Sequence, residues 1–191
     1  TSILKADTIQ DTDGNNIINE SGNTITIGAS GDTISIPSGA TFNINGTAGT
    51  GIGNNKPAFR ATMSGNQTGL SSEANTKVVF DTETYDTNND FASSTFTPTE
   101  AGKYLIYGHL YLSSLDNTFR VMHQIRKNDS EIFVNLKSSG GTQDHTLESF
   151  VVAEANGTSD YFTIFASQNT GGTNRTTSGP NTRFGAFKII E

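Results

Sequence analysis

The chain has 191 residues, of which 16% are charged, with a formal net charge of −7 and no cysteine. The missing thiols exclude disulfide scaffolds, cysteine-based catalysis and zinc ribbons. The acidic balance without any basic run argues against nucleic acid as a partner, and no stretch is long and apolar enough to insert into a membrane.

The first segment, residues 1–55, predicts a repetitive shaft of very short strands. Apolar and polar side chains alternate in three bursts, and glycines at positions 22, 31 and 39 recur every eight to nine residues. The bursts are Ile25 with Ile27, Ile34 with Ile36, and Phe42 with Ile44. A single thin ribbon cannot bury these side chains, so either the C-terminal part or other copies of the chain must cover them. The short repeat favours copies wound around a common axis.

After a glycine-rich linker at residues 46–55, residues 56–191 predict a second domain made of strands. The expected strands are 58–63, 76–81, 94–97, 103–112, 119–126, 131–136, 146–154, 161–167 and 183–190. Such a series of short strands without a helix indicates a sandwich or barrel. Several strands, such as "YLIYGHLYL", are apolar on both faces, so the outer face of one sheet also needs a cover. Another copy of the same surface would supply it.

One segment resembles the signature of C1q-like domains, the trimeric jelly rolls of the C1q and tumour-necrosis-factor superfamily. It is "VVFDTETYDTNNDFASSTFTPTEAGKYLIYG", and the matching positions are Phe80, Asp86, Phe91, Phe96, Gly102 and Tyr104. The opening "PAFRA" and the closing "TRFGAFKII" are also similar to the family. The resemblance implies an all-β fold in which a C1q-like jelly-roll β-sandwich forms a head at residues 56–191.

The N-terminal repeats, in particular "GDTISIPSGAT", resemble the shafts of bacteriophage tail fibres. The two resemblances together imply a homotrimer located in a virion, in contact with other virion structural proteins. Its interface would include the six shaft residues Ile25, Ile27, Ile34, Ile36, Phe42 and Ile44, and the head residues Tyr107, His109 and Tyr111. The head would bind a glycan or protein on the host cell surface. Two alternatives stay open: a secreted, extracellular C1q-like ligand or lectin, and a structural capsid or baseplate decoration fibre.

No pattern in the sequence indicates an enzyme or a cofactor. His109 and His123 lie within apolar strands, where packed or interface histidines are the rule. The acidic pairs Asp81 with Glu83 and Asp86 with Asp90 fit turns and strand edges better than glycan cleavage. The run at residues 11–15 lacks the glycine and glutamate of a calcium loop. Calcium is therefore not indicated by a motif, although acids repeated three times by symmetry can bind a cation.

The expected receptor site lies in the loops of one end of the sandwich. Successive strands alternate in direction, so the loops at 113–118, 137–145 and 168–182 should lie at the distal end, opposite the base where the shaft joins. Two of these loops are long and rich in Gly, Ser, Thr and Asn, and extra loop length on one end suggests a function. Asp144, His145, Asn174 and Arg175 are the predicted receptor contacts.

Overall fold

The computed structural model describes residues 8–10, 12, 16–21, 24–26, 30–40, 55–115, 119–139, 143–169, 175–177, 179 and 181–189. The chain divides into two compact units, Thr1–Gly49 and Thr50–Glu191. The division falls inside the glycine-rich stretch at residues 46–55. Each unit is described below by itself.

The first unit contains a small antiparallel sheet formed by β1 (Thr8–Gln10), β2 (Asn16–Ser21) and β3 (Thr24–Thr26). Residues 32–37 form no strand, and the side chains of Ile34 and Ile36 are 59% and 47% exposed. The strand expected around these two isoleucines is therefore not formed, since within the described residues no strand pairs with this backbone. Of the other predicted shaft residues, only the backbone of Ile25 is described, and Ile27, Phe42 and Ile44 lie outside the described residues.

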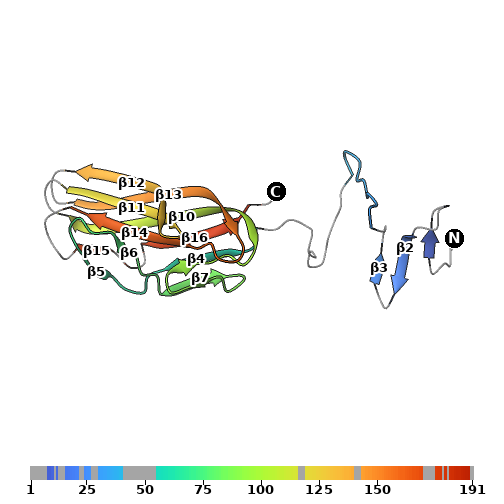
Figure 1. Ribbon diagram of the computed structural model, residues 1–191, viewed down its shortest axis with the longest axis horizontal. Coiled ribbons are helices and arrows are strands. Elements are labelled where there is room, and N and C mark those ends of the chain that lie inside the picture. Colours follow the sequence, from blue (N-terminus) through green and yellow to red (C-terminus); the bar gives the residue numbers. More distant parts are fainter. Residues whose placement is uncertain are drawn as a thin grey trace. The chain divides into compact units, whose positions relative to one another are not determined.

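The second unit is an antiparallel β-sandwich of two sheets (Figure 1). The first sheet contains β4 (Ala58–Thr62), β5 (Gln67–Leu70), β7 (Thr82–Asp86), β10 (Ala101–Leu115), β13 (Gln143–Asn156), β15 (Arg175–Thr177) and β16 (Arg183–Lys188). The second sheet contains β6 (Thr76–Lys77), β8 (Phe91–Ala92), β9 (Thr95–Phe96), β11 (Phe119–Lys127), β12 (Ser130–Ser139) and β14 (Phe162–Gln168). The prediction of an all-β head is confirmed. The predicted strand at 76–81 was too long, since β6 ends at Lys77.

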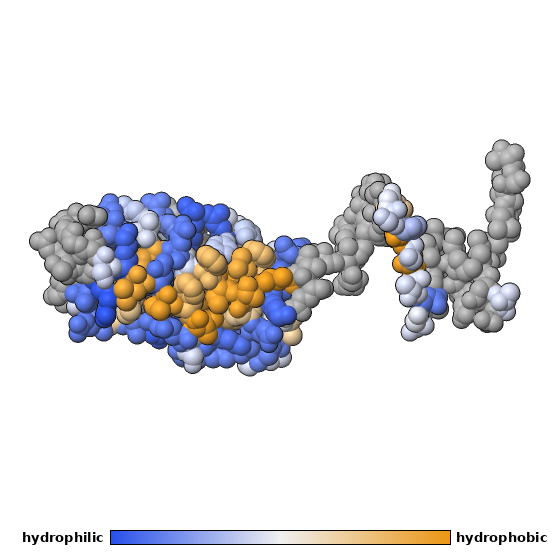
Figure 2. Space-filling model, turned by 90° about the horizontal axis from the view of Figure 1, so that it is seen from above, coloured by the Kyte–Doolittle hydropathy of each residue, from blue (hydrophilic) through white to orange (hydrophobic). Residues whose placement is uncertain are grey.

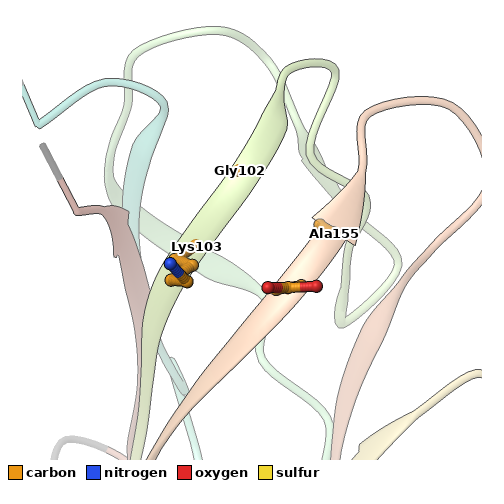
Figure 3. Close-up of a pocket in the computed structure, with 4 residues that line it drawn as sticks. Gly102, Lys103 and Ala155 are labelled. Atoms are coloured by element: carbon orange, nitrogen blue, oxygen red, sulfur yellow. The ribbon is translucent and has the colours of Figure 1, made fainter. Parts of the chain in front are cut away.

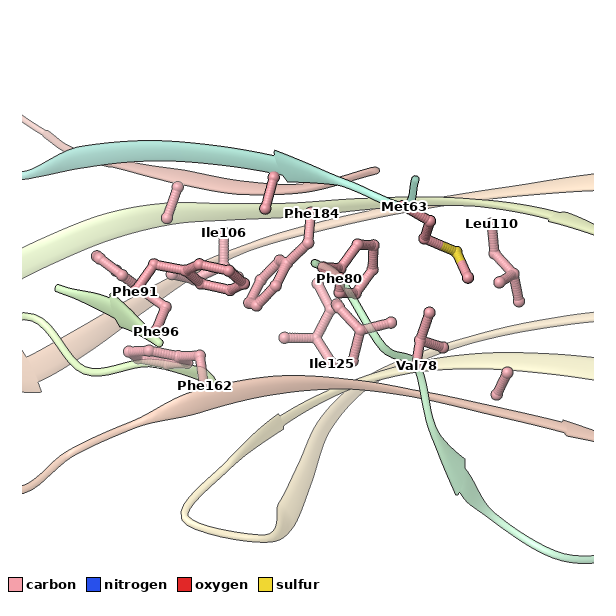
Figure 4. Close-up of a cluster of buried hydrophobic side chains, with 14 of the residues drawn as sticks. Met63, Val78, Phe80, Phe91, Phe96, Ile106, Leu110, Ile125, Phe162 and Phe184 are labelled. Atoms are coloured by element: carbon pink, nitrogen blue, oxygen red, sulfur yellow. The ribbon is translucent and has the colours of Figure 1, made fainter. Parts of the chain in front are cut away.

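A cluster of aromatic rings fills the space between the sheets (Figure 4). Phe59 in β4 stacks on Phe96 in β9 with ring centroids 4.4 Å apart, and Phe184 in β16 meets Phe59 edge-on at 4.9 Å. All three side chains are fully buried. Because aromatic rings bury large apolar areas and prefer these geometries, the cluster fixes how the two sheets pack.

Strand pairing places the strand ends at two opposite ends of the sandwich. β16 runs antiparallel to β4, so Phe187 lies beside Ala58 at the base and Arg183 beside Thr62 at the distal end. β10 and β13 pair antiparallel from the base, where Ala101 faces Asn156, to the distal end. The strand ends that flank residues 116–118, 140–142 and 170–174 all lie at the distal end, as predicted.

Candidate functional site: the outer sheet face, the edge strip and the distal end

The outer face of the first sheet carries a row of large side chains that no other part of the described chain covers. Residues alternate along β10, so Tyr104, Ile106 and Leu110 face the core while Tyr107, His109 and Tyr111 are only half-buried. The three predicted interface residues of the head therefore share one outward face.

Tyr107 lies at the centre of this outer face. Its register partners form a row across the sheet, from Phe150 through Tyr107, Gly185 and Arg60 to Tyr85. The Tyr107 phenol lies over Gly185 and is hydrogen-bonded to Tyr85, so a Cβ at position 185 would overlap it. Burial, and then the neighbouring Tyr85, raise the pKa of Tyr107 to about 12. The glycine thus leaves space for a ring that lies flat on the sheet.

A second apolar surface runs along one edge of the sandwich, where β12 and β13 lie beside each other (Figure 2). We call it the edge strip, and it consists of Val134 (42% exposed), Leu136 (48%), Phe150 (67%) and Val152 (53%). Four large apolar side chains gathered on one surface differ from single exposed hydrophobic residues, which are common on soluble proteins. The edge strip is therefore a candidate interface.

At the distal end, Asp144 and Arg175 lie on the two strands that flank the end of β10. Near its distal end, β10 pairs with β13 on one side and with β15 on the other. Leu112 of β10 is the register partner of both His145 in β13 and Thr177 in β15. Asp144 is exposed, and its Oδ2 accepts a 2.6 Å hydrogen bond from the hydroxyl of Tyr111. Only the backbone of Arg175 is described, and Asn174 lies outside the described residues.

His145 is not the surface residue that the sequence predicted. It belongs to β13 and alternates with Asp144, so its side chain points inward and is only 2% exposed. The expectation of a loop ending at residue 145 was wrong, because strand pairing with β10 extends to Gln143. His145 therefore cannot contact a receptor at the surface of this chain.

His109 and His123 lie on opposite sides of the first sheet. His109 faces outward, with its Nδ1 2.5 Å from the carbonyl oxygen of Asn181 and its Nε2 3.9 Å from a carboxylate oxygen of Glu148. Because a carbonyl oxygen only accepts, Nδ1 of His109 carries the proton in this contact. His123 is fully buried, and its Nδ1 lies 3.0 Å from Oγ of Ser149. Burial, and then the nearby His109, lower the pKa of His123 to about 3.

The acidic side chains of the early strands hold turns. Asp81 accepts hydrogen bonds from the backbone N–H of Ser64 at 2.6 Å and from its hydroxyl at 2.5 Å. Asp86 accepts from the backbone N–H groups of Asn88 and Phe91. Carboxylates engaged in this way stabilise the local backbone.

At the base, a dense set of hydrogen bonds joins the two short connections. Asp160 accepts from the amide of Asn128 at 2.7 Å and from the N–H of Asn156 at 2.9 Å, and it pairs with Lys127 at 2.9 Å. These contacts hold the pKa of Asp160 below its usual value, with the Asn128 hydrogen bond as the largest cause. The base is thus fixed by its own polar groups.

The described surface contains hollows, and two of them are defined by their lining residues. One, of about 180 Å³, lies near the base and is lined by Gly102, Lys103, Glu154 and Ala155 (Figure 3). Lys103 and Glu154 are direct partners across β10 and β13, so this hollow combines one charge of each sign. The other hollow, of about 340 Å³, lies on the second sheet towards the distal end. Its lining residues are Glu73, Asn75, Arg120, Met122, Ser167, Gln168 and Asn169.

The sequence did not single out the residues of the larger hollow. They come from three separate segments, 73–75, 120–122 and 167–169, and no motif links them. Within the described residues, no group of three or more His, Asp or Glu side chains is placed to hold a metal ion. None of the described part of the chain forms an apolar helix of the length needed to cross a bilayer.

Comparison with known proteins identifies the fold. No protein-family model matches the sequence, and no curated protein matches it. Among solved structures, the globular domain of the zebrafish complement 1qA protein is similar with a TM-score of 0.55 and 18% identity, over 70% of this chain and 96% of that chain. Murine APRIL gives 0.52 and 12% identity, over 69% of this chain and 98% of that chain.

Eiger TNF from S. frugiperda is similar with a TM-score of 0.50 and 14% identity, over 69% of this chain and 91% of that chain. The head therefore has the jelly-roll fold of C1q and TNF domains. The fold predicted from the sequence resemblance is confirmed.

Proposed function

We propose that the protein is a homotrimeric bacteriophage fibre protein without enzymatic activity, whose head attaches the virion to a glycan on the host surface. The C1q-like fold of the head and the fibre-like repeats of residues 1–55 support this combination. The hydrogen bonds that engage Asp81 and Asp86 favour a structural role for these carboxylates over catalysis.

The single observation that carries the proposal is the uncovered edge strip. The edge strip lies beside the outer face of the first sheet, because Phe150 is also the register partner of Tyr107. Packing the edge strip of one copy against the outer face around Tyr107 of the next gives a heterologous contact, which forms a closed ring when the rotation closes. The fold resemblance favours a ring of three copies, as do the predicted interface residues Tyr107, His109 and Tyr111.

The distal end is the proposed attachment surface. The base is occupied by its own hydrogen-bond network around Asp160, whereas Asp144 is exposed and oriented by Tyr111. Arg175 begins β15, the strand on the other side of β10, and Asn174 precedes it in the sequence. Polar groups of these types are suited to recognising sugar hydroxyls. His145 is buried and does not belong to this surface.

Sedimentation equilibrium of Phe150→Asp tests the assembly. Phe150 is 67% exposed, and a carboxylate there would be desolvated in the contact, so we expect a folded monomer. Val79→Asp places the same charge on a valine that is 49% exposed. Val79 lies between β6 and β7, neither of which pairs with β12 or β13, so this variant should remain a trimer. A wild-type protein that is a folded monomer at micromolar concentration would refute the assembly.

Attachment is tested by shortening residues 171–180 to a tight turn and measuring binding of the labelled trimer to host cells. We expect binding to be lost while the trimer and its thermal stability are kept. Undiminished binding by the correctly folded variant would place the receptor site away from these loops.

A secreted, extracellular ligand or lectin of the C1q or TNF class is the second candidate. The observation in its favour is that the similar structures include a complement protein and a TNF. Tail or baseplate genes next to the coding gene would exclude it. A structural decoration fibre would instead remain bound to the virion and fail to bind any cell. Labelling the protein on virions and measuring attachment to cells distinguishes this alternative from the proposed function.

A further inference from the structure

We infer that the hollow of about 340 Å³ on the second sheet is a binding site for a neutral saccharide. It is formed where β11 and β14 approach the distal end, together with the segment that contains Glu73 and Asn75. This inference rests on the proposed function, because it specifies a place on the head at which a host glycan is recognised. It differs from the proposed contacts Asp144 and Arg175, which lie on the first sheet.

The walls of this saccharide pocket are held in place by backbone contacts. The N–H of Glu73 donates to the carbonyl of Gln168 at 2.6 Å, and Ser72 is bridged to Gln168. Asn169 donates its N–H to the carbonyl of Arg120 at 3.0 Å, and its side-chain oxygen accepts the N–H of Arg120 at 2.5 Å. A pocket whose walls are fixed before binding loses little conformational entropy when a ligand binds.

Three polar side chains that line the pocket, those of Glu73, Asn75 and Arg120, are available to a ligand. Within the described part of the chain, the guanidinium of Arg120 and the carboxylate of Glu73 form no ion pair or hydrogen bond, and the same holds for the side-chain amide of Asn75. Arg120, Glu73 and Asn75 are exposed. Exposed polar side chains are normally hydrated, so these three groups around one hollow can exchange water for the polar groups of a ligand without breaking a bond within the protein.

The combination of groups selects the chemical class of the ligand. The Glu73 carboxylate accepts hydrogen bonds, whereas the Arg120 guanidinium only donates and the Asn75 amide does both. Sugar hydroxyls donate and accept, so neighbouring hydroxyls can satisfy all three side chains. Met122 adds an apolar wall that suits the C–H face of a sugar ring. A phosphate or an anionic sugar would be repelled by Glu73 and by the net charge of −7.

The pocket stays accessible in the proposed trimer. Within the second sheet, β12 lies between the edge of the sandwich and β11, so the pocket on β11 and β14 is separated from β13 and Phe150. Three copies would present three pockets on one particle. Repeated binding to a surface dense in glycans then gives an avidity that exceeds the affinity of one site.

The test uses the full chain on an array of neutral and anionic oligosaccharides, with Arg120→Ala, Glu73→Gln and the control Glu131→Gln. Glu131 is exposed on β12 and does not line the pocket. We expect the wild type and Glu131→Gln to bind a neutral glycan equally. The affinity of each pocket variant for this glycan should be lower by a factor of about ten or more, the effect of losing a charge-assisted hydrogen bond. Sedimentation and melting temperature should remain those of the wild type.

The outcomes separate this inference from the proposed function. If the pocket variants bind the glycan as the wild type does, while shortening 171–180 abolishes binding, the pocket is refuted and the proposed attachment function stands. If the wild type attaches to host cells and binds no neutral oligosaccharide, the inference is also refuted. Selective loss of glycan binding in both pocket variants, with Glu131→Gln unchanged, supports it.

Discussion

Gly108 in β10 lies directly against the imidazole ring of His123 in β11, across the interior of the sandwich. A Cβ at position 108 would lie 2.6 Å from Cε1 of His123 and 3.0 Å from Ile164. The ring cannot simply move away, because it is fully buried and its Nδ1 contacts Ser149. The glycine is therefore required by packing at this position, where the two sheets approach each other closely.

Gly108→Ala should lower the free energy of unfolding by about 1–3 kcal/mol, the usual effect of adding a methylene to a filled core. Denaturant unfolding measures it, with Gly65→Ala as the control because a Cβ there meets nothing within 4 Å. In the double variant with His123→Ala, the added methyl should cause a smaller loss than in the wild type. Equal losses in both backgrounds would show that the two residues are not coupled.

Acid should destabilise the head through His123 before the carboxylates titrate. The folded chain keeps this imidazole neutral down to a pKa of about 3, whereas the unfolded chain protonates it near its ordinary value of about 6.5. The unfolded state therefore binds more protons between these values. The free energy of unfolding should fall by about 1.4 kcal/mol per pH unit as the pH drops below 6.5. Above pH 6.5, His123 should not make the free energy of unfolding depend on pH.

Thermal or denaturant unfolding between pH 6.5 and pH 5 tests this, since carboxylates contribute little there. His123→Gln should reduce the slope whatever its effect on the stability at neutral pH, and the remainder is expected from His145, whose pKa is also lowered by burial. A slope that persists unchanged in this variant would assign the acid sensitivity to another group.

The strong apolar alternation of the long strands made them predictable from the sequence. The segment at 103–112 has inward-facing residues such as Tyr104 and Leu110 at every second position, and the expected strand coincides with most of β10. β5, β7 and β15 were missed because their sequences, such as "TETYD" in β7, contain few apolar residues. They form strands because β7 pairs with β4, β15 with β10 and β5 with β15, which a local pattern cannot show.

The candidate sites were only partly predictable for the same reason. The outward face with Tyr107 follows from two-sided strands, and the distal end follows from alternating strand directions. The burial of His145 depended on how far β13 continues beside β10, which a polar sequence does not reveal. The pocket around Arg120 joins residues nearly fifty positions apart, as shown by its bond to Asn169 (49 positions), and only the folded sandwich brings them together.

Asp160→Asn should lower the melting temperature of the head at neutral pH. The charged oxygens of Asp160 accept from Asn128 and Asn156 and pair with Lys127, and an amide cannot replace all of these contacts. The pKa of Asp160 is lowered in the folded state, so its contribution is present above the ordinary carboxyl pKa and is lost as the pH falls through the lowered value. Differential scanning calorimetry at pH 7 and pH 3 should therefore show a smaller difference between variant and wild type at the lower pH. Glu131 is exposed on β12, which pairs with the strand that contains Lys127. Glu131→Gln should have the melting temperature of the wild type at both pH 7 and pH 3.

Ile36→Asp should disrupt the proposed shaft while the head stays folded. Ile36 is 47% exposed in the single chain, and threefold packing around an axis would bring three carboxylates together away from water. Limited proteolysis should then cleave residues 20–46 rapidly, whereas the melting transition of the head should not move. Ser35→Asp, at the neighbouring exposed position, is the matched control. Wild-type protease resistance in Ile36→Asp would show that this isoleucine is not axial.

The chain enters and leaves the sandwich at the same end. The N–H of Lys188 donates to the carbonyl of Pro57 at 2.9 Å, and the N–H of Ile189 donates to the carbonyl of Lys103 at 2.8 Å. The first and last strands of the head therefore have their free ends next to each other. Grafted onto an unrelated stem, or given a fluorescent domain after its last strand, the head should keep its opposite end unobstructed, and recognition could be transferred between carriers without redesigning the join.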